Sequence, residues 1–311
     1  MTADATKTYV RYLAAKQHVD NRSLNRHVWH TLKANLPPTS RRRKLEVVDF
    51  GAGIGTMLER SIAWGLTPHL HYTMVEKTPG FLAAFKSLSL QRRHSADYTL
   101  DWQNSTRADL RFGDGGGTVD IVCADLYDII SNCENHRRWD LITAHAVMDL
   151  VNIDEVLNGF QRLVKPGGLL YLTLNYDGLT VFQPAFDPDF EQQLLDDYHR
   201  SMDQRTIDGR PSGSSQSGRE LLYRLTQRHL PILAAGSSDW IVYPHGRGYP
   251  DDDARFLAAI IQTFNDELQR NKQLDPHRLA AWVSSRQSQI DAAELIFMAH
   301  NIDFLVRVPA D

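Results

Sequence analysis

Cysteine is scarce in this sequence, which holds only Cys123 and Cys133 among its 311 residues. Two thiols cannot supply the four ligands of a structural zinc site or the dense disulfide framework of a small secreted domain. The sequence therefore predicts two reduced thiols and no metal site.

The sequence also lacks a surplus of either charge and any long apolar run. Lys and Arg number 34 against 38 Asp and Glu, for a net charge of -4, whereas nucleic-acid binders usually carry a strongly basic face. No apolar stretch approaches the 18 or so residues of a membrane span, and residues 1–10 lack the apolar core of a signal peptide. These absences predict a cytoplasmic protein that binds neither nucleic acid nor membrane.

What is present is the alternation of an α/β fold. From Glu46 to Asn175, short apolar runs alternate with amphipathic segments, a pattern typical of a mostly parallel sheet with helices on both faces. The chain is about twice a single-domain length of roughly 150 residues, so one domain with insertions and a core with a cap both remain open. The expected parts are a helical lid (1–40), a core (41–178), a helical insertion (179–235) and the last two strands (236–311) with a helical cap between them (251–291).

One segment after Asn175 has almost no apolar residue. Residues 208–218 are rich in Gly and Ser, a composition typical of loops. We expect a mobile loop there that admits a ligand and excludes water.

A three-glycine turn is the most informative motif. Residues 47–56, VVDFGAGIGT, are a buried strand that runs into Gly51, Gly53 and Gly55 and then into a helix. Glycines at such a turn let the backbone approach a ligand and expose the amides of the helix N-terminus. A nicotinamide dinucleotide site prefers Gly or Ala at the position held by Thr56, so the turn favours a different nucleoside ligand.

Two acidic residues end later strands. Glu76 ends the run 72–75, where a carboxylate can accept both hydroxyls of a ribose; the alternative is a solvated turn residue. Asp125 ends the run 122–124, where it could accept the amine of an adenine; the alternative is that it caps the next helix.

Five motifs together resemble the class I S-adenosylmethionine-dependent methyltransferases. The resemblance implies a Rossmann-like fold of seven strands, six parallel and the last antiparallel, with residues 239–243 and 302–308 as the sixth and seventh strands. It also implies S-adenosylmethionine as methyl donor and S-adenosylhomocysteine as product. The motifs are VVDFGAGIGT, YTMVEK, CADL, WDLITAHAVMDLV and LVKPGGLLYLTLN, in the family's order.

The resemblance also assigns residues to the donor. Arg22 or Lys16 of the lid could pair with the donor's carboxylate, although surface solvation explains either residue equally well. The residues expected around the rest of the donor are Asp49 behind the turn, Gly51, Ala52, Gly53 and Gly55 in it, Glu76 and Lys77 at the ribose, Asp125 and Leu126 at the adenine, and Ala144 and His145 beside the sulfonium.

Methyl transfer from a sulfonium is an in-line displacement that needs geometry and, for a protic acceptor, a base. His145 is the first candidate base because an imidazole titrates near neutrality; the alternative is a packing histidine. Asp149 could orient His145, or simply favour a helix N-terminus. Tyr176, which leaves the predicted fifth strand, is the second candidate catalytic residue after His145.

The rest of the chain predicts a small organic acceptor enclosed by helical caps and aromatic walls. Two other functions remain open. A non-catalytic partner or regulatory subunit that binds the same donor would have a blocked acceptor cavity. A nicotinamide-dependent oxidoreductase is opposed by Thr56 and by the Asp125 segment.

Overall fold

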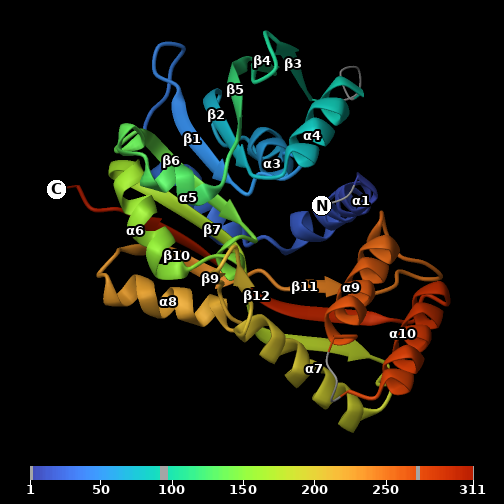
Figure 1. Ribbon diagram of the computed structural model, residues 1–311. Coiled ribbons are helices and arrows are strands. Elements are labelled where there is room, and N and C mark those ends of the chain that lie inside the picture. Colours follow the sequence, from blue (N-terminus) through green and yellow to red (C-terminus); the bar gives the residue numbers. More distant parts are fainter. Residues whose placement is uncertain (1–2, 92–96, 271–273, 311) are drawn as a thin grey trace.

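The computed structural model describes residues 3–91, 97–270 and 274–310. Its main feature is a ten-stranded sheet (Figure 1). Nine of the strands follow the order β10-β12-β7-β6-β1-β2-β5-β4-β3, and the tenth, β11, pairs with β12. The strands of this sheet are β1 (Leu45–Phe50), β2 (His69–Glu76), β3 (Tyr98–Trp102), β4 (Arg107–Phe112), β5 (Gly115–Cys123), β6 (Trp139–His145), β7 (Val164–Gln183), β10 (Ile232–Ser237), β11 (Trp240–Val242) and β12 (Ile296–Arg307).

Seven of these strands confirm the expected core. β5, β2, β1, β6 and β7 pair in parallel, and β12 is antiparallel to β7. β10 is antiparallel to β12 and so runs in the same direction as β7. The six parallel strands and the antiparallel last strand are those of the predicted Rossmann-like fold.

Helices cover both faces of this core, as the alternating pattern predicts. One face packs against α2 (Arg26–Asn35), α3 (Thr56–Ala63) and α4 (Pro79–Gln91). The other packs against α5 (Leu126–Ser131), α6 (Ile153–Leu163) and α8 (Ser217–Gln227). No helix in the described part of the chain is long and apolar enough to cross a bilayer.

The sixth strand lies earlier in the chain than predicted. It is β10, and the segment expected there, residues 239–243, instead forms β11 against the first residues of β12. β4 and β5 form an antiparallel hairpin at one edge of the sheet, and β3 extends that edge. Gly113 lies in the turn, whereas Gly115, Gly116 and Gly117 lie within β5, and a Cβ on Gly117 would stand 1.5 Å from the Leu70 carbonyl oxygen. Only glycine therefore allows β5 to lie so close to β2.

β7 and β12 continue past the core and carry a cap. β7 bends at Leu174, where φ is +54°, and the β7–β12 register shifts beside it. The buried Asp303 holds this bend, because its carboxylate accepts hydrogen bonds from the Leu174 and Asn25 amides at 2.8 and 2.9 Å. Beyond the bend, the strands pack with β11 in one apolar cluster that includes residues of α1 (Ala3–Ser23), α7 (Pro188–Asp203), α9 (Asp253–Leu268) and α10 (Pro276–Asp291).

The segment 208–218 begins with a small hairpin. β8 (Thr206–Ile207) pairs with β9 (Arg210–Pro211), and α8 begins at Ser217. The predicted mobility of this segment stays a prediction.

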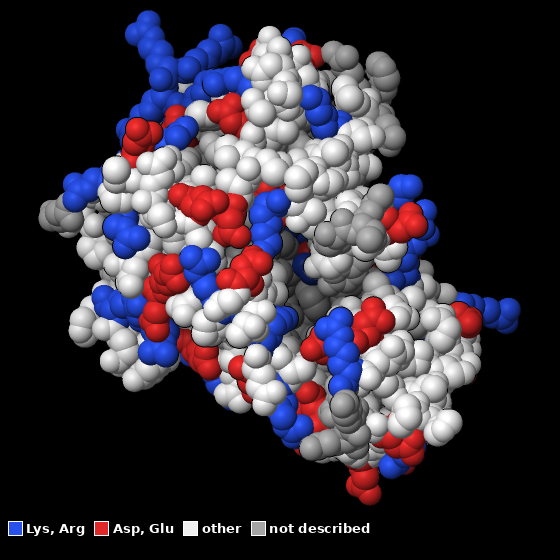
Figure 2. Space-filling model, viewed as in Figure 1, with Lys and Arg blue, Asp and Glu red and all other residues white. Residues whose placement is uncertain are grey.

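Figure 2 shows positive and negative side chains interspersed over the face in view, with a hollow where the core meets the cap.

Candidate active site

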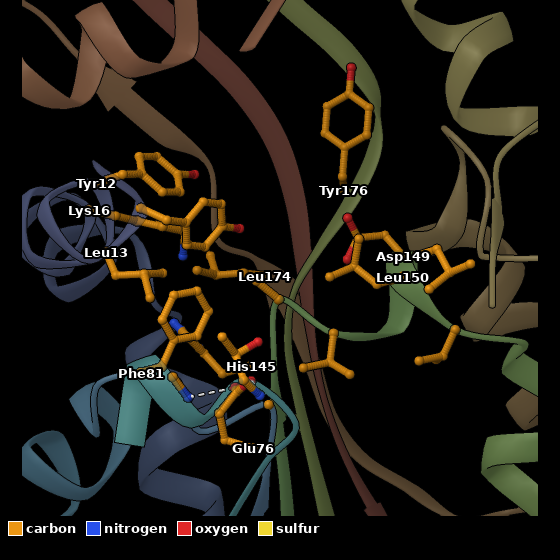
Figure 3. Close-up of a pocket in the computed structure, with 18 of the residues that line it drawn as sticks. Tyr12, Leu13, Lys16, Glu76, Phe81, His145, Asp149, Leu150, Leu174 and Tyr176 are labelled. Carbon is orange, nitrogen blue, oxygen red and sulfur yellow. Dashed lines mark hydrogen bonds between the residues drawn. The ribbon is translucent and has the colours of Figure 1, made fainter. Parts of the chain in front are cut away.

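A cavity of 620 Å³ opens at the carboxyl ends of the parallel strands and continues under the cap. Its walls come from the turns after β1, β2, β5 and β6, from α1, and from the cap elements β11 and α9. Open α/β sheets bind ligands outside the carboxyl ends of their strands, so this cavity is the candidate active site (Figure 3).

The glycine turn forms the floor of the cavity. Gly51, Ala52 and Gly53 line it, and Gly51 and Gly53 have φ values of +67° and +55°. A Cβ on Gly51 would stand 2.6 Å from Val147 Cγ2, so the turn and the segment after β6 touch closely. Gly55 instead caps α3, and a Cβ there would stand 2.5 Å from the Phe85 ring.

Glu76 is buried at the end of β2 and lines the cavity. Its two carboxylate oxygens accept hydrogen bonds from the Gly53 amide at 3.1 Å and the Thr78 amide at 2.8 Å. A carboxylate oxygen can accept two hydrogen bonds, so Glu76 is fixed in place by the turns and keeps capacity for a ligand's hydroxyls.

Asp125 and Leu126 lie at the wall formed by the end of β5. Asp125 caps α5 by accepting from the Tyr127 amide at 2.9 Å, and it also lines the cavity. Lys77, which directly follows β2, lies 3.8 Å from Asp125 and 3.2 Å from Asp208, in the turn between β8 and β9. The hairpin therefore lies beside the predicted adenine end of the site.

His145 also lines the cavity, at the centre of a buried polar network. Its Nδ1 lies 2.8 Å from Thr173 Oγ1, and its Nε2 lies 3.0 Å from Asp20 Oδ2 and 3.2 Å from an Arg60 nitrogen. Asp20 also accepts from Lys16 at 2.6 Å and from Trp240 Nε1 at 3.0 Å. The network thus joins α1, α3, β6 and β11.

This environment does not support the prediction that His145 is a general base. Burial, reinforced by the Arg60 charge, lowers the pKa of His145 to about 3 despite the nearby carboxylate of Asp20. Both ring nitrogens already have partners. An imidazole of such low basicity stays neutral and does not accept a proton from a substrate. His145 instead holds together the elements that form this wall of the cavity.

Asp149 and Tyr176 both line the cavity, but not as expected. Asp149, in the short 3-10 helix η3 (Met148–Leu150), makes no hydrogen bond with His145, so it does not orient that ring. The Tyr176 hydroxyl lies 2.7 Å from His199 Nε2 and 2.9 Å from Thr180 Oγ1, and burial raises its pKa to about 12. Tyr176 therefore shapes the wall as a neutral phenol.

Besides Gly55, three residues assigned to the donor lie outside the cavity lining. Ala144 is buried within β6, and Asp49 is buried within β1, just before the glycine turn. Arg22 points to the cap, where its guanidinium pairs with Asp253 at 2.5 Å and with Asp251 at 3.4 Å. Of the two lid cations, the structure therefore brings Lys16 to the cavity and directs Arg22 away from it.

Replacing Arg22 by alanine is expected to leave donor affinity within about twofold of the wild type. The same variant leaves the buried Asp253 carboxylate without its cation, which costs roughly 1–3 kcal/mol of stability. Calorimetric titration with S-adenosylmethionine and urea unfolding measure the two quantities. A tenfold loss of donor affinity with an intact fold would return Arg22 to the site.

Asp49 offers a test of pH dependence. Burial raises the pKa of Asp49 from 3.8 to about 7, although a 2.8 Å hydrogen bond from Thr143 acts to lower it. Between these values the folded state holds the proton more tightly than the unfolded state, so this group's contribution to stability falls as pH rises through that window. Asp49→Asn removes the titration. We expect the stability of the variant relative to wild type to rise from pH 4 to pH 7 in urea unfolding, and a constant difference would contradict the assignment.

Sequence reasoning missed three residues of the polar network around His145. Asp20, Arg60 and Trp240 belong to three distant segments, and no local motif connects them. The one available signal was spacing: Lys16 and Asp20 lie four residues apart and so share a helix face.

No protein-family model matches the chain, and no curated protein matches its sequence. Solved structures with a similar course of the chain include the YcgJ protein of Bacillus subtilis, at 13% identity and a TM-score of 0.46 over 92% of this chain and 100% of that one. A geranyl diphosphate C-methyltransferase from Streptomyces coelicolor A3(2) matches at 10% identity and a TM-score of 0.43, over 90% and 77%.

A third similar structure is phosphoethanolamine N-methyltransferase 2 from Haemonchus contortus, solved in complex with S-adenosyl-L-methionine. It matches at 13% identity and a TM-score of 0.39, and covers 92% of this chain. The present chain spans about half of that protein, 52% of its length.

Proposed function

We propose that this protein is an S-adenosylmethionine-dependent methyltransferase that acts on a small organic molecule. The observation that carries the proposal is the continuity of one cavity from the glycine turn, Glu76 and Asp125 to an aromatic chamber under the cap. Its volume of 620 Å³ lies within the range of about 300–1,000 Å³ typical of ligand pockets.

The residues divide the work by position. Gly51 and Gly53 allow the donor's methionine portion to lie against the backbone, Glu76 accepts the ribose hydroxyls, and Asp125 with Leu126 holds the adenine. Lys16 lines the same cavity, and its ammonium, which pairs with Asp20 at 2.6 Å, has further N–H groups for the donor's carboxylate. Because the donor supplies an activated methyl group, the protein has to align the acceptor in line with the methyl–sulfur bond and to exclude water.

Two observations disfavour the alternatives. Thr56 lines the cavity at the position where a nicotinamide dinucleotide site prefers Gly or Ala. A non-catalytic partner that keeps only the donor site would have a closed acceptor side, whereas here the cavity extends to β11 and α9.

The exposed thiols of Cys123 and Cys133, which form no disulfide, fit the reducing cytoplasm, which we propose as the site of action.

Isothermal titration calorimetry tests the proposal directly. We expect saturable binding of S-adenosylmethionine and of S-adenosylhomocysteine, each at one site per chain, and no binding of NADH under the same conditions. Binding of NADH alone would replace the proposed function with the oxidoreductase alternative.

A further inference from the structure

The cavity's far half is a chamber lined by aromatic side chains. It lies between α1, which forms one wall, and the cap elements α7, α9, β11 and β12. The Tyr198 and Phe264 rings stack with centroids 4.0 Å apart, so this wall presents ring faces and edges with little freedom to rearrange. The lining aromatics of the chamber are Tyr9, Tyr12, Tyr198, Trp240, Phe264 and Phe297.

The positive charges of the cavity are already paired. Among the described lining residues, the lysines and arginines are Lys16, Lys77 and Arg210. Their partners are Asp20 at 2.6 Å, Asp208 at 3.2 Å and Glu155 at 3.9 Å, respectively. No unpaired cation in the described lining is therefore left to hold an anionic acceptor in the chamber.

Asp149 is the exception among the acidic residues of the lining. Its Oδ1 is buried and has no hydrogen-bond partner among the described residues. Figure 3 shows its carboxylate facing the open space between Tyr176 and the side chains of α1. Asp20 and Glu76, by contrast, accept from several protein donors each. A buried carboxylate oxygen without a donor costs free energy that a ligand's N–H group would recover.

We propose, building on the methyltransferase function proposed above, that the acceptor is a small apolar amine whose nitrogen is held by the Asp149 carboxylate in the aromatic chamber. The aromatic rings suit both the apolar body and a cationic nitrogen, because ring faces attract ammonium groups. Burial raises the pKa of Asp149, although the neighbouring Arg205 opposes this, and a raised pKa suits a group that must take up a proton.

The reaction balances without any further reactant. The Asp149 carboxylate first takes one proton from the bound ammonium. The lone pair that this frees forms the new nitrogen–carbon bond while the methyl–sulfur bond breaks and its electron pair returns to sulfur. The sulfonium becomes a neutral thioether, the methylated nitrogen is again an ammonium, and the proton on Asp149 is the one proton released in each turnover.

Matched ligands test the inference. The ligands share one of two skeletons, phenyl or cyclohexyl, and carry an amine, an alcohol or a carboxylate. The phenyl series is 2-phenylethylamine, 2-phenylethanol and 3-phenylpropanoate, and the cyclohexyl series has the same three groups. The binding of each ligand to the complex of the protein with S-adenosylhomocysteine is measured. We expect the amines to bind about tenfold or more tightly than their partners, and Asp149→Asn to remove that preference, since an unpaired buried charge costs 2–5 kcal/mol or more in binding. With S-adenosylmethionine, mass spectrometry should find the methyl group on nitrogen.

Asp128→Asn, which changes an exposed carboxylate in the first turn of α5, is the matched control and should keep the preference. The inference is overturned if neither skeleton shows an amine preference, or if Asp149→Asn retains it while donor binding is intact. Failure of the wild type to bind S-adenosylhomocysteine would instead overturn the proposed function, so the two failures are distinguishable.

Discussion

Replacing Asp20 by alanine is expected to lower the free energy of unfolding by about 3–5 kcal/mol, the usual cost of removing one partner from a buried ion pair. Asp20 is 2% exposed, and its carboxylate contacts Lys16, Arg60 and His145. Lys16 and Arg60 are themselves 6% and 1% exposed, so the variant leaves two buried cations without their acid. Urea unfolding at pH 7 measures the loss.

The control for this variant is Asp251→Ala. Asp251 is an exposed carboxylate that pairs with Arg22 at 3.4 Å, and exposed pairs contribute about 0–1 kcal/mol. A loss for Asp20→Ala no larger than for this control would show that the network does not hold the lid to the core.

The Asp20 effect should also depend on pH. Burial by itself would raise its pKa, but Lys16 and the hydrogen-bonded His145 outweigh burial and hold the pKa well below its ordinary value of 3.8. A carboxylate with a lowered pKa contributes stability that is fully present above the unfolded value and is lost as pH falls further. We expect the difference between wild type and Asp20→Ala to be constant near neutrality and to shrink below about pH 4.

Glu76→Ala is expected to weaken the binding of S-adenosylmethionine by about 100-fold or more. Two ribose hydroxyls would each donate to a carboxylate, and hydrogen bonds to charged groups contribute about 1.5–3 kcal/mol each. The variant also frees the Gly53 and Thr78 amides, which Glu76 now holds in place. Calorimetric titration of the folded variant measures the change.

Two further variants make the Glu76 result specific. Glu76→Gln keeps one acceptor oxygen and should fall between wild type and alanine, while Glu134→Ala, at an exposed acid, should match wild type. Unchanged donor affinity in Glu76→Ala would remove this residue from the site.

The grouping of the glycine turn, Glu76 and Asp125 around one cavity could be predicted because it depends on local rules. The glycine turn, Glu76 and Asp125 each follow a strand, and the carboxyl ends of neighbouring parallel strands meet at one edge of the sheet. The strand–helix alternation gave the parallel core for the same reason. In these places, short sequence patterns and the fold lead to the same arrangement.

The position of β10, which is the sixth strand of the core, and the length of β7, which is the fifth, could not be predicted in this way. β10 reads ILAAGS, whose small residues lack the alternation of a typical strand, whereas β11 contains the strong β-formers Trp240, Ile241 and Val242. β7 continues through Tyr-Asp-Gly, which in sequence is typical of a turn. Pairing with β12 on the same sheet outweighs both local signals.

The roles of His145 and Asp149 depend on contacts that local sequence does not contain. His145 sits at a position suitable for a base, but Asp20 and Arg60 come to it from other segments and occupy its Nε2. Asp149 was expected beside His145 because of its spacing, yet η3 turns it toward the chamber.

The cap shares two bent strands with the core, and this arrangement limits how the protein can exchange its ligands. β7 and β12 run from the floor of the cavity into the cap, and Asp303 holds their bend through its hydrogen bond with Leu174. The cap therefore cannot move away from the core as a separate body unless pairs between these strands break. In the proposed reaction, we expect the spent donor and the methylated product to leave past α1 or the β8–β9 hairpin, which line the cavity. We therefore expect the movement of these two elements to limit turnover, while the acceptor walls keep their shape between cycles.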